Sequence, residues 1–138
     1  MIYSYKKYVD EITTKELRLP QDAQSLQFIG TELCTLDDGL TYVCIPDWYT
    51  LPTEQPKEIA ASIQPVTLTD TLREQIKQAS PHVRLINTRV QAAIAERYTL
   101  ADEIKLLRTA PSPEMEAYNT YAEECRAWGR AEKAKLGL

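Results

Sequence analysis

An α+β fold is predicted for this chain: a small N-terminal β-hairpin module, a proline-rich connector and a C-terminal antiparallel bundle of about four helices. Three observations predict it. Residues 26–46 hold two runs rich in β-branched and aromatic residues around an Asp-Asp-Gly turn, and residues 46–65 hold four prolines. From residue 68 onwards, apolar residues recur at the three- and four-residue spacing of helices. We therefore expect a β-rich module at 1–46, a connector at 47–67 and a helical domain at 68–138.

Length and composition set broad limits on the class of protein. A chain of 138 residues is long enough to bury roughly two thirds of its unfolded surface. Its 43% hydrophobic and 26% charged residues are ordinary for a soluble globular protein. The apolar runs are far shorter than the ~20 residues of a membrane span, and the first residues lack the hydrophobic core of a signal peptide. We expect a cytoplasmic product that does not bind membranes.

Charge is distributed unevenly along the chain. Residues 1–66 carry an acidic excess of five charges, whereas residues 67–138 carry a basic excess of one, which together give the net charge of −4. This distribution provides no basic footprint for nucleic acid. Arg84, Arg89 and Arg97 share one predicted helix, but a solvated face or a carboxylate partner explains them more simply. No nucleic-acid partner is expected.

The N-terminal residues are expected to form β structure. Alternation of Tyr3 and Tyr5 fits a short strand or an exposed arm. The Asp-Asp-Gly run at 37–39 predicts a hairpin turn between strands at about 28–36 and 40–45, because glycine accepts a positive φ without steric cost. Both faces of the second strand are partly apolar, and two strands alone are marginally stable. The hairpin must therefore be covered on both sides or bound to another molecule.

The prolines between residues 46 and 65 bias the residues before them away from helix. This segment is therefore predicted to be extended and to separate the two modules. Trp48 and Tyr49 lie beside these prolines, where they either cap the core or present a binding surface.

Two helices are predicted over residues 70–79 and 81–97. Ser80 is expected to cap the second of them, and Pro81 fits its first position, where a missing N–H costs nothing. The second helix carries an apolar stripe at helical spacing, which consists of Val83, Ile86, Val90, Ala93 and Ile94.

Two further helices follow. Thr99 and Asp102 have the spacing of a capping box at the start of a helix that reaches residue 108, with Leu100, Ile104 and Leu107 as its packing face. Ser112 is expected to cap the last helix, which Gly137 ends. That helix places Met115, Tyr118, Ala122, Cys125 and Trp128 at spacings of three and four residues, with acids early and bases late, as suits the helix dipole.

Residue types that support catalysis are sparse. The three cysteines form no CxxC pair, so we expect buried free thiols, with Cys34 and Cys44 able to face each other across the hairpin. His82 is the single histidine, which excludes a histidine-rich metal site within one chain. Neither a GxSxG serine nor a glycine-rich phosphate loop is present. The chain is therefore expected to be no enzyme and to hold no cofactor or metal.

The aromatic composition favours a binding role. Eight tyrosines and two tryptophans stand against one phenylalanine, and tyrosine and tryptophan are enriched at protein interfaces. On the last helix, such residues are more often part of a core than of an interface. The candidate partner-binding residues are Tyr42, Trp48, Tyr49, Tyr118, Tyr121 and Trp128.

One family resemblance goes further than composition. It is carried by Tyr98, Asp102-Glu103-Ile104, Leu107-Arg108, Tyr118, Tyr121, Glu124-Cys125-Arg126 and Trp128-Gly129. With this loose pattern, the last 70 residues resemble the C-terminal helical part of small bacteriophage tail proteins, the groups described as tail-fibre assembly or attachment proteins and tail assembly chaperones. Many of those proteins join a small β-rich part to a helical segment that contains tryptophan.

The resemblance implies a non-enzymatic phage tail accessory or structural protein. Such a protein binds the tail fibre or a neighbouring tail subunit, assists its assembly or attachment in the host cytoplasm, and in some cases stays in the virion tail. The alternative is a cytoplasmic regulatory or adaptor module that docks another protein through its helical part. Mass spectrometry of purified particles would separate these two hypotheses.

Overall fold

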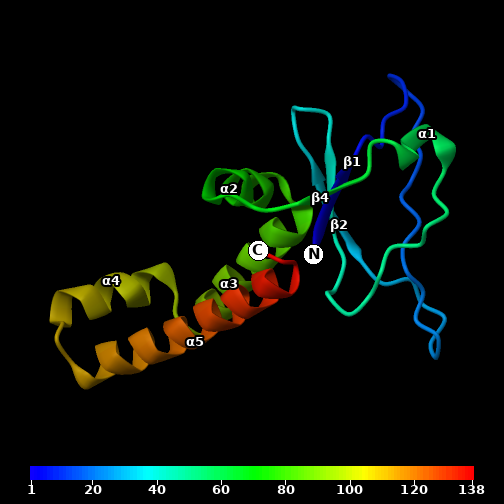
Figure 1. Cartoon of the computed structure of the whole chain (residues 1–138). Coiled ribbons are helices and arrows are strands. Elements are labelled where there is room, and N and C mark those ends of the chain that lie inside the picture. Colours follow the sequence, from blue (N-terminus) through cyan, green and yellow to red (C-terminus); the bar gives the residue numbers. More distant parts are fainter. The chain divides into compact units, whose positions relative to one another are not determined.

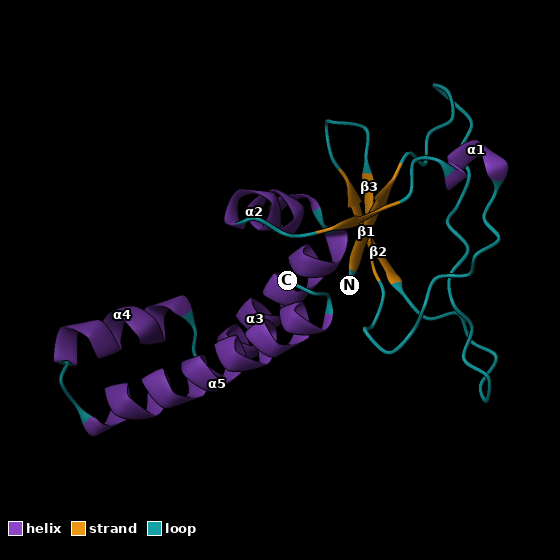
Figure 2. Ribbon diagram, in the orientation of Figure 1, coloured by secondary structure: helices purple, strands orange, loops and turns teal.

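The computed structural model describes all residues, 1–138, and confirms the α+β class: an antiparallel sheet is followed by helices (Figures 1 and 2). The strands are β1 (Ile2–Tyr5), β2 (Thr31–Thr35), β3 (Thr41–Cys44) and β4 (Gln64–Val66). The helices are α1 (Lys57–Ala60), α2 (Asp70–Ala79), α3 (Pro81–Arg97), α4 (Leu100–Thr109) and α5 (Pro113–Lys135). The four predicted helices thus correspond to α2–α5.

The sheet has the strand order β2-β3-β1-β4, and every neighbouring pair is antiparallel. The predicted hairpin is β2–β3, whose turn contains Gly39 with a φ of 80°. Of the two options for residues 3–5, the strand is confirmed. β1 lies between β3 and β4, so the first residues of the chain form the centre of the sheet.

Both faces of the sheet are covered, as the two-sided pattern of the hairpin requires. Alternating residues of a strand point to opposite faces. Ile2, Tyr42 and Cys44 belong to one buried cluster with Ile76 of α2. The intervening side chains form a second cluster on the other face, which contains Tyr5, Leu17, Val43, Ile45 and Ile59.

The segment predicted as an extended connector contains two short elements, α1 and β4. β4 pairs with β1 in spite of Pro65, because a proline is tolerated on an edge strand, where its missing N–H breaks no ladder. Tyr49, Leu51 and Ile63 pack against the second cluster. The prolines therefore lie in a segment that builds the sheet and its core, in addition to joining two regions.

The chain divides into two compact units. The sheet unit comprises residues 1–81 and 136–138, and the helical unit comprises residues 82–135. The expected ranges of 1–46, 47–67 and 68–138 differ from this division at α2, whose Leu72, Ile76 and Ala79 pack in the first cluster of the sheet. The helical unit accordingly contains α3, α4 and α5 without α2.

Within the helical unit, α3 turns its predicted apolar stripe inward. Val83 is buried and Ile86, Val90, Ala93 and Ile94 are partly buried, whereas the residues between them are largely exposed. α3 and α5 approach closely at Gly129, where an added Cβ would lie 2.7 Å from Cγ2 of Val90. α4 and α5 form a helical hairpin (Figure 1).

The helix caps agree with the sequence at two positions and differ at one. Thr99 and Asp102 form the predicted capping box, and the hydroxyl of Ser112 accepts the N–H of Met115 at 3.1 Å. Ser80 does not cap α3. Its hydroxyl is buried without a hydrogen-bond partner, while its own N–H donates to the carbonyl of Ile76. Ser80 is the residue that ends α2, and in this conformation its hydroxyl makes no hydrogen bond to the first turn of α3.

The cysteines are free thiols, and Cys34 and Cys44 do not face each other. A register shift between Glu32 and Cys34 places Cys34 opposite Tyr42 and Cys44 opposite Thr31. Both thiols are buried. Burial, with a smaller contribution from the Asp38 carboxylate, raises the pKa of Cys34 to about 11, so that this thiol is a core side chain.

Candidate interaction surfaces

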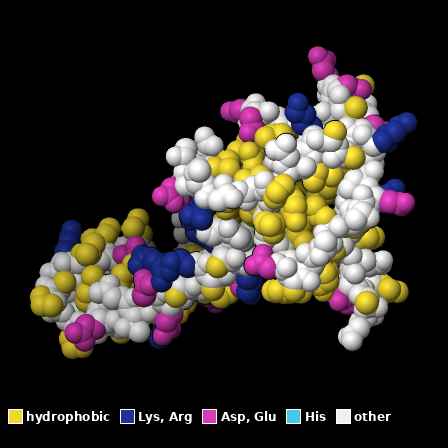
Figure 3. All heavy atoms as spheres, in the orientation of Figure 1, with side chains coloured by type: hydrophobic (Ala, Val, Ile, Leu, Met, Phe, Trp, Pro, Cys, Tyr) yellow, Lys and Arg dark blue, Asp and Glu magenta, His cyan; other side chains and the backbone are white.

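The most exposed apolar surface of the helical unit lies on α4. Leu100, Ile104 and Leu107 are 73%, 45% and 67% exposed, and we call these three residues the α4 stripe. No residue of α4 is buried. Figure 3 shows hydrophobic side chains on the surface over this helix. The stripe therefore has no partner within the chain.

The stripe is a single face of the helix. Residues separated by three and four positions lie above one another, so residues 100, 104 and 107 lie within an arc of about 60°. The adjoining side of α4 contacts α5: Glu103, next to Leu107 around the helix, accepts a hydrogen bond from the Tyr118 hydroxyl at 2.9 Å. The sequence predicts residues 100, 104 and 107 as a packing face, and the structure leaves that face exposed beside the α4–α5 contact.

Three tyrosines join the helices of this unit. The rings of Tyr98 and Tyr118 meet edge to face at 4.9 Å between centroids, and Tyr121 lies 5.9 Å from Tyr98. Tyr121 donates to the carbonyl of Ala93 at 2.8 Å. The guanidinium of Arg97 lies 4.6 Å above the Tyr121 ring, a geometry that favours cation–π attraction. Tyr118 and Tyr121, both candidate contact residues, thus contribute to internal packing.

Two of the shifted pKa values in the helical unit, those of Tyr118 and Asp102, follow from hydrogen bonds. The hydrogen bond to Glu103 raises the pKa of Tyr118, because it favours the protonated phenol. At the start of α4, the backbone N–H of Thr99 donates to the Asp102 carboxylate at 2.9 Å. That bond holds the pKa of Asp102 below its usual range. Each shift is explained by a structural contact.

Tyr42 lies in the core of the sheet unit. It is only 4% exposed, and its hydroxyl donates to Asp38 at 3.1 Å. Burial and the Asp38 carboxylate raise its pKa to about 12. The expectation that Tyr42 contacts a partner is corrected here, because β3 is the strand whose two faces are both covered.

Trp48 and Tyr49 have different environments although they are adjacent. Trp48 is 82% exposed. Tyr49 packs against the second cluster and donates to the Asp22 carboxylate at 2.9 Å, which ties the segment after β3 to the loop at 21–28. Of the two roles open to this pair, Tyr49 has the position of a core cap and Trp48 the position of a contact residue.

Trp128 is 42% exposed on α5, next to the glycine where α3 and α5 approach. Sequence reasoning missed other exposed apolar side chains: Ile12, Leu26 and Phe28 in the loops of the sheet unit, and Leu85 on α3. Their only sequence signal is an apolar residue among polar neighbours, in a loop or, for Leu85, on a helix, and a core residue gives the same signal.

The structure meets the requirements neither of a metal site nor of a membrane-spanning helix. No group of three or more histidine, cysteine or acidic side chains is placed to hold a metal ion. None of the helices is long and apolar enough to span a bilayer.

In comparisons with known proteins, no family model, curated protein or solved structure matches the chain.

Proposed function

We propose that this chain is a non-enzymatic accessory or structural protein of a bacteriophage tail. It binds the tail fibre or a neighbouring tail subunit and assists its assembly or attachment, in the host cytoplasm and then, where it is retained, in the virion tail. The class of protein rests on the resemblance of residues 98–129 to phage tail assembly and attachment proteins. The binding role is supported by the surface of α4.

One observation carries the binding role. α4 buries none of its residues, yet it presents Leu100, Ile104 and Leu107 along one face. Contiguous exposed apolar surface marks interaction sites in soluble proteins, and an amphipathic helix commonly lays such a face into a groove of its partner. The α4 stripe is the face that we assign to the fibre or tail subunit.

The non-enzymatic part of the proposal has its own support. The shifted pKa values belong to desolvated tyrosines and thiols, to tyrosines bonded to carboxylates, to Lys7 in its ion pair with Glu32, and to carboxylates that accept backbone N–H groups in turns and caps. Catalytic acids and bases, by contrast, need shifted pKa values in a cleft where a substrate can reach them.

The test is co-expression with the tail fibre and tail subunits encoded by adjacent reading frames, followed by purification through a tag on this chain. Wild type is expected to retain one tail protein. The double variant Leu100→Gln/Leu107→Gln is expected to lose it, with a change of only about 0.5 kcal/mol or less per site in unfolding free energy because both side chains are exposed.

Leu85→Gln is the matched control, since it removes an exposed leucine from α3 of the same unit and is expected to retain the partner. Mass spectrometry of purified particles tests whether the protein stays in the tail. Retention of a host protein in place of any tail component would overturn the proposal in favour of the adaptor hypothesis. Equal retention by the double variant would show that another surface binds.

A further inference from the structure

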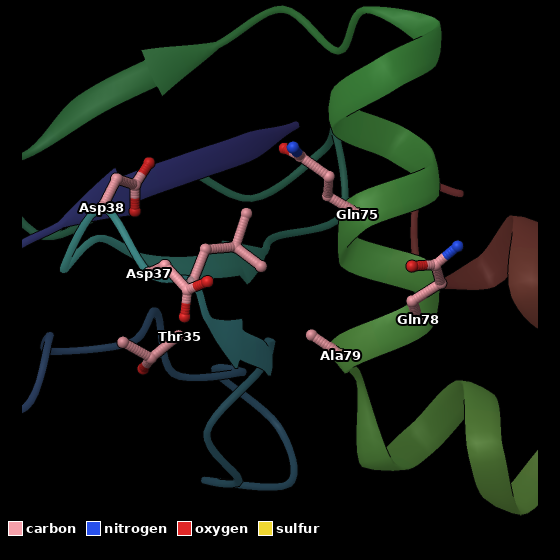
Figure 4. A pocket seen from close by; sticks show the side chains of 7 residues that line it. Thr35, Asp37, Asp38, Gln75, Gln78 and Ala79 are labelled. Carbon is pink, nitrogen blue, oxygen red and sulfur yellow. The ribbon is translucent and has the colours of Figure 1, made fainter.

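A pocket of about 570 Å³ lies in the sheet unit between the tip of the β2–β3 hairpin and α2. Figure 4 shows the hairpin side chains on one side of it and the α2 side chains on the other. Its lining includes Thr35, Asp37, Asp38, Gln75, Gln78 and Ala79. All of these residues belong to the same compact unit.

β2 borders this pocket with an unpaired backbone edge. It is the outermost strand on its side of the sheet. Leu36 donates its N–H to the carbonyl of Leu40, so these residues form a hydrogen-bonded pair. Bonded and non-bonded pairs alternate along an antiparallel ladder, which makes Thr35 and Thr41 a non-bonded pair. The N–H and C=O of Thr35 therefore point away from β3, towards the open edge.

The two edges of the sheet differ in their ability to accept another strand. On the β4 edge, Pro65 lacks an N–H, a common protection against pairing. On the β2 edge, the register shift between Glu32 and Cys34 interrupts regular pairing. The segment that remains open is the Thr35 end, which is the part of β2 that lines the pocket.

The polar groups of the pocket define the chemistry of an occupant. Asp37 and Asp38 are its only charged lining residues, and Asp37 makes no hydrogen bond or ion pair. Opposite them, Gln75 and Gln78 are exposed, and their carboxamides make no hydrogen bond within the chain. Such carboxamides can hydrogen-bond to a peptide backbone, and the carboxylates favour a cationic side chain.

We propose that an extended polypeptide segment carrying lysine or arginine binds in this groove, with its backbone paired to the Thr35 end of β2 and a basic side chain beside Asp37. Addition of a strand to an open edge takes its affinity from main-chain hydrogen bonds and its specificity from the neighbouring side chains. This site is separate from the α4 stripe, and the inference stands whether or not α4 docks a tail protein.

The probe is a fluorescein-labelled octapeptide in which lysine alternates with valine and threonine, and binding is measured by fluorescence polarisation. A matched peptide with glutamate for every lysine is expected to bind at least about tenfold more weakly. A basic peptide with alternate backbone amides methylated is also expected to bind about tenfold more weakly, because its methylated amides cannot donate hydrogen bonds to the edge of β2. Amide shifts in the NMR spectrum should cluster at Thr35, Gln75 and Gln78.

Protein variants test the same contact from the other side. Asp37→Asn is expected to weaken the basic peptide about two- to fivefold, the range of an exposed ion pair. Glu11→Gln removes an equal charge from a loop of the same unit that does not line the pocket, and it is expected to leave affinity unchanged. Leu100→Gln/Leu107→Gln should bind the peptide normally.

Three outcomes would each overturn the inference. They are binding of the methylated peptide as tight as that of its parent, equal affinity for the basic and acidic peptides, and no binding of the basic peptide at millimolar concentration.

Discussion

Gly129 shows how one residue sets the distance between two helices. A methyl group at this position would lie 2.7 Å from Cγ2 of Val90, and the stiff β-branched valine has few rotamers with which to avoid it. At an unobstructed position inside a helix, replacing glycine by alanine raises the free energy of unfolding by about 1 kcal/mol. Overpacking costs about 1–3 kcal/mol, and the two effects oppose each other at this site.

We expect Gly129→Ala to lower the unfolding free energy of the helical unit by about 1 kcal/mol, since the overpacking outweighs the helical gain. Urea denaturation followed by circular dichroism at 222 nm measures the loss. In a Val90→Ala background the same change should stabilise, because the obstructing methyl is gone. A stabilising effect of Gly129→Ala in wild type would contradict the close approach of α3 and α5.

Ser80 precedes α3 and Thr99 precedes α4. Substitution by alanine is expected to change the free energy of unfolding differently at these two positions. The Thr99 hydroxyl accepts the N–H of Asp102 at 3.2 Å, and loss of an N-cap costs about 1 kcal/mol. The buried Ser80 hydroxyl bonds to nothing, and a buried unpaired polar group is itself destabilising. Thr99→Ala is expected to destabilise, whereas Ser80→Ala is expected to be neutral or stabilising, both measured by urea denaturation. A larger loss for Ser80→Ala would show that its hydroxyl does cap.

The capping box of α4 also predicts that the stability of this helix depends on pH. The Thr99 N–H lowers the pKa of Asp102 in the folded state, whereas the unfolded carboxyl keeps a pKa of about 3.9. The unfolded chain therefore binds more protons between these values, so the stabilisation is complete above pH ~3.9 and is lost as pH falls through the folded pKa. The protection factors of the α4 amides, which compare each exchange rate with the intrinsic rate at the same pH, should therefore fall between pH 5 and 2. In Asp102→Asn, this component of the pH profile should disappear.

At the scale of elements, the sequence predicts the helices better than it predicts their partners. The Ser-Pro starts, the Thr99 cap and the apolar spacing place α2, α3, α4 and α5 because they are local signals. The same local signal at residues 100, 104 and 107 predicts an apolar face without telling whether that face is buried. β4 escapes prediction because it forms through pairing with β1, 60 to 64 residues earlier. α1 escapes it because a helix of four residues is too short to show a periodic pattern.

Some of the candidate contact residues pack inside the chain and others stay exposed, and a local sequence signal does not separate the two groups. Aromatic composition predicts that tyrosine and tryptophan supply contact area, but the composition does not distinguish contacts within the chain from contacts with a partner. Tyr42 is buried in the first cluster of the sheet, and Tyr118 and Tyr121 pack against Tyr98. Trp48 remains free because it points out of a segment that Tyr49 anchors.

At the scale of the whole molecule, the residues that complete the sheet unit come from both ends of the chain. Leu136 and Leu138 pack against the first cluster of the sheet, although they follow directly on α5. Gly137 lets the chain turn there with a φ of 78°, and an added Cβ would lie 3.0 Å from Cδ1 of Ile2. The sheet unit is therefore discontinuous in sequence.

Truncation after Lys135 is expected to lower the stability of the sheet unit by about 2 kcal/mol, because two partly buried leucines lose their contacts. Hydrogen exchange should accelerate in β1 and β3, the strands that hold Ile2 and Cys44, while α4 keeps its wild-type exchange rate. The full-length double variant Leu136→Ala/Leu138→Ala separates side-chain packing from chain length and should reproduce most of the effect. Unchanged protection of β1 in both proteins would show that residues 136–138 contribute nothing to the core of the sheet unit.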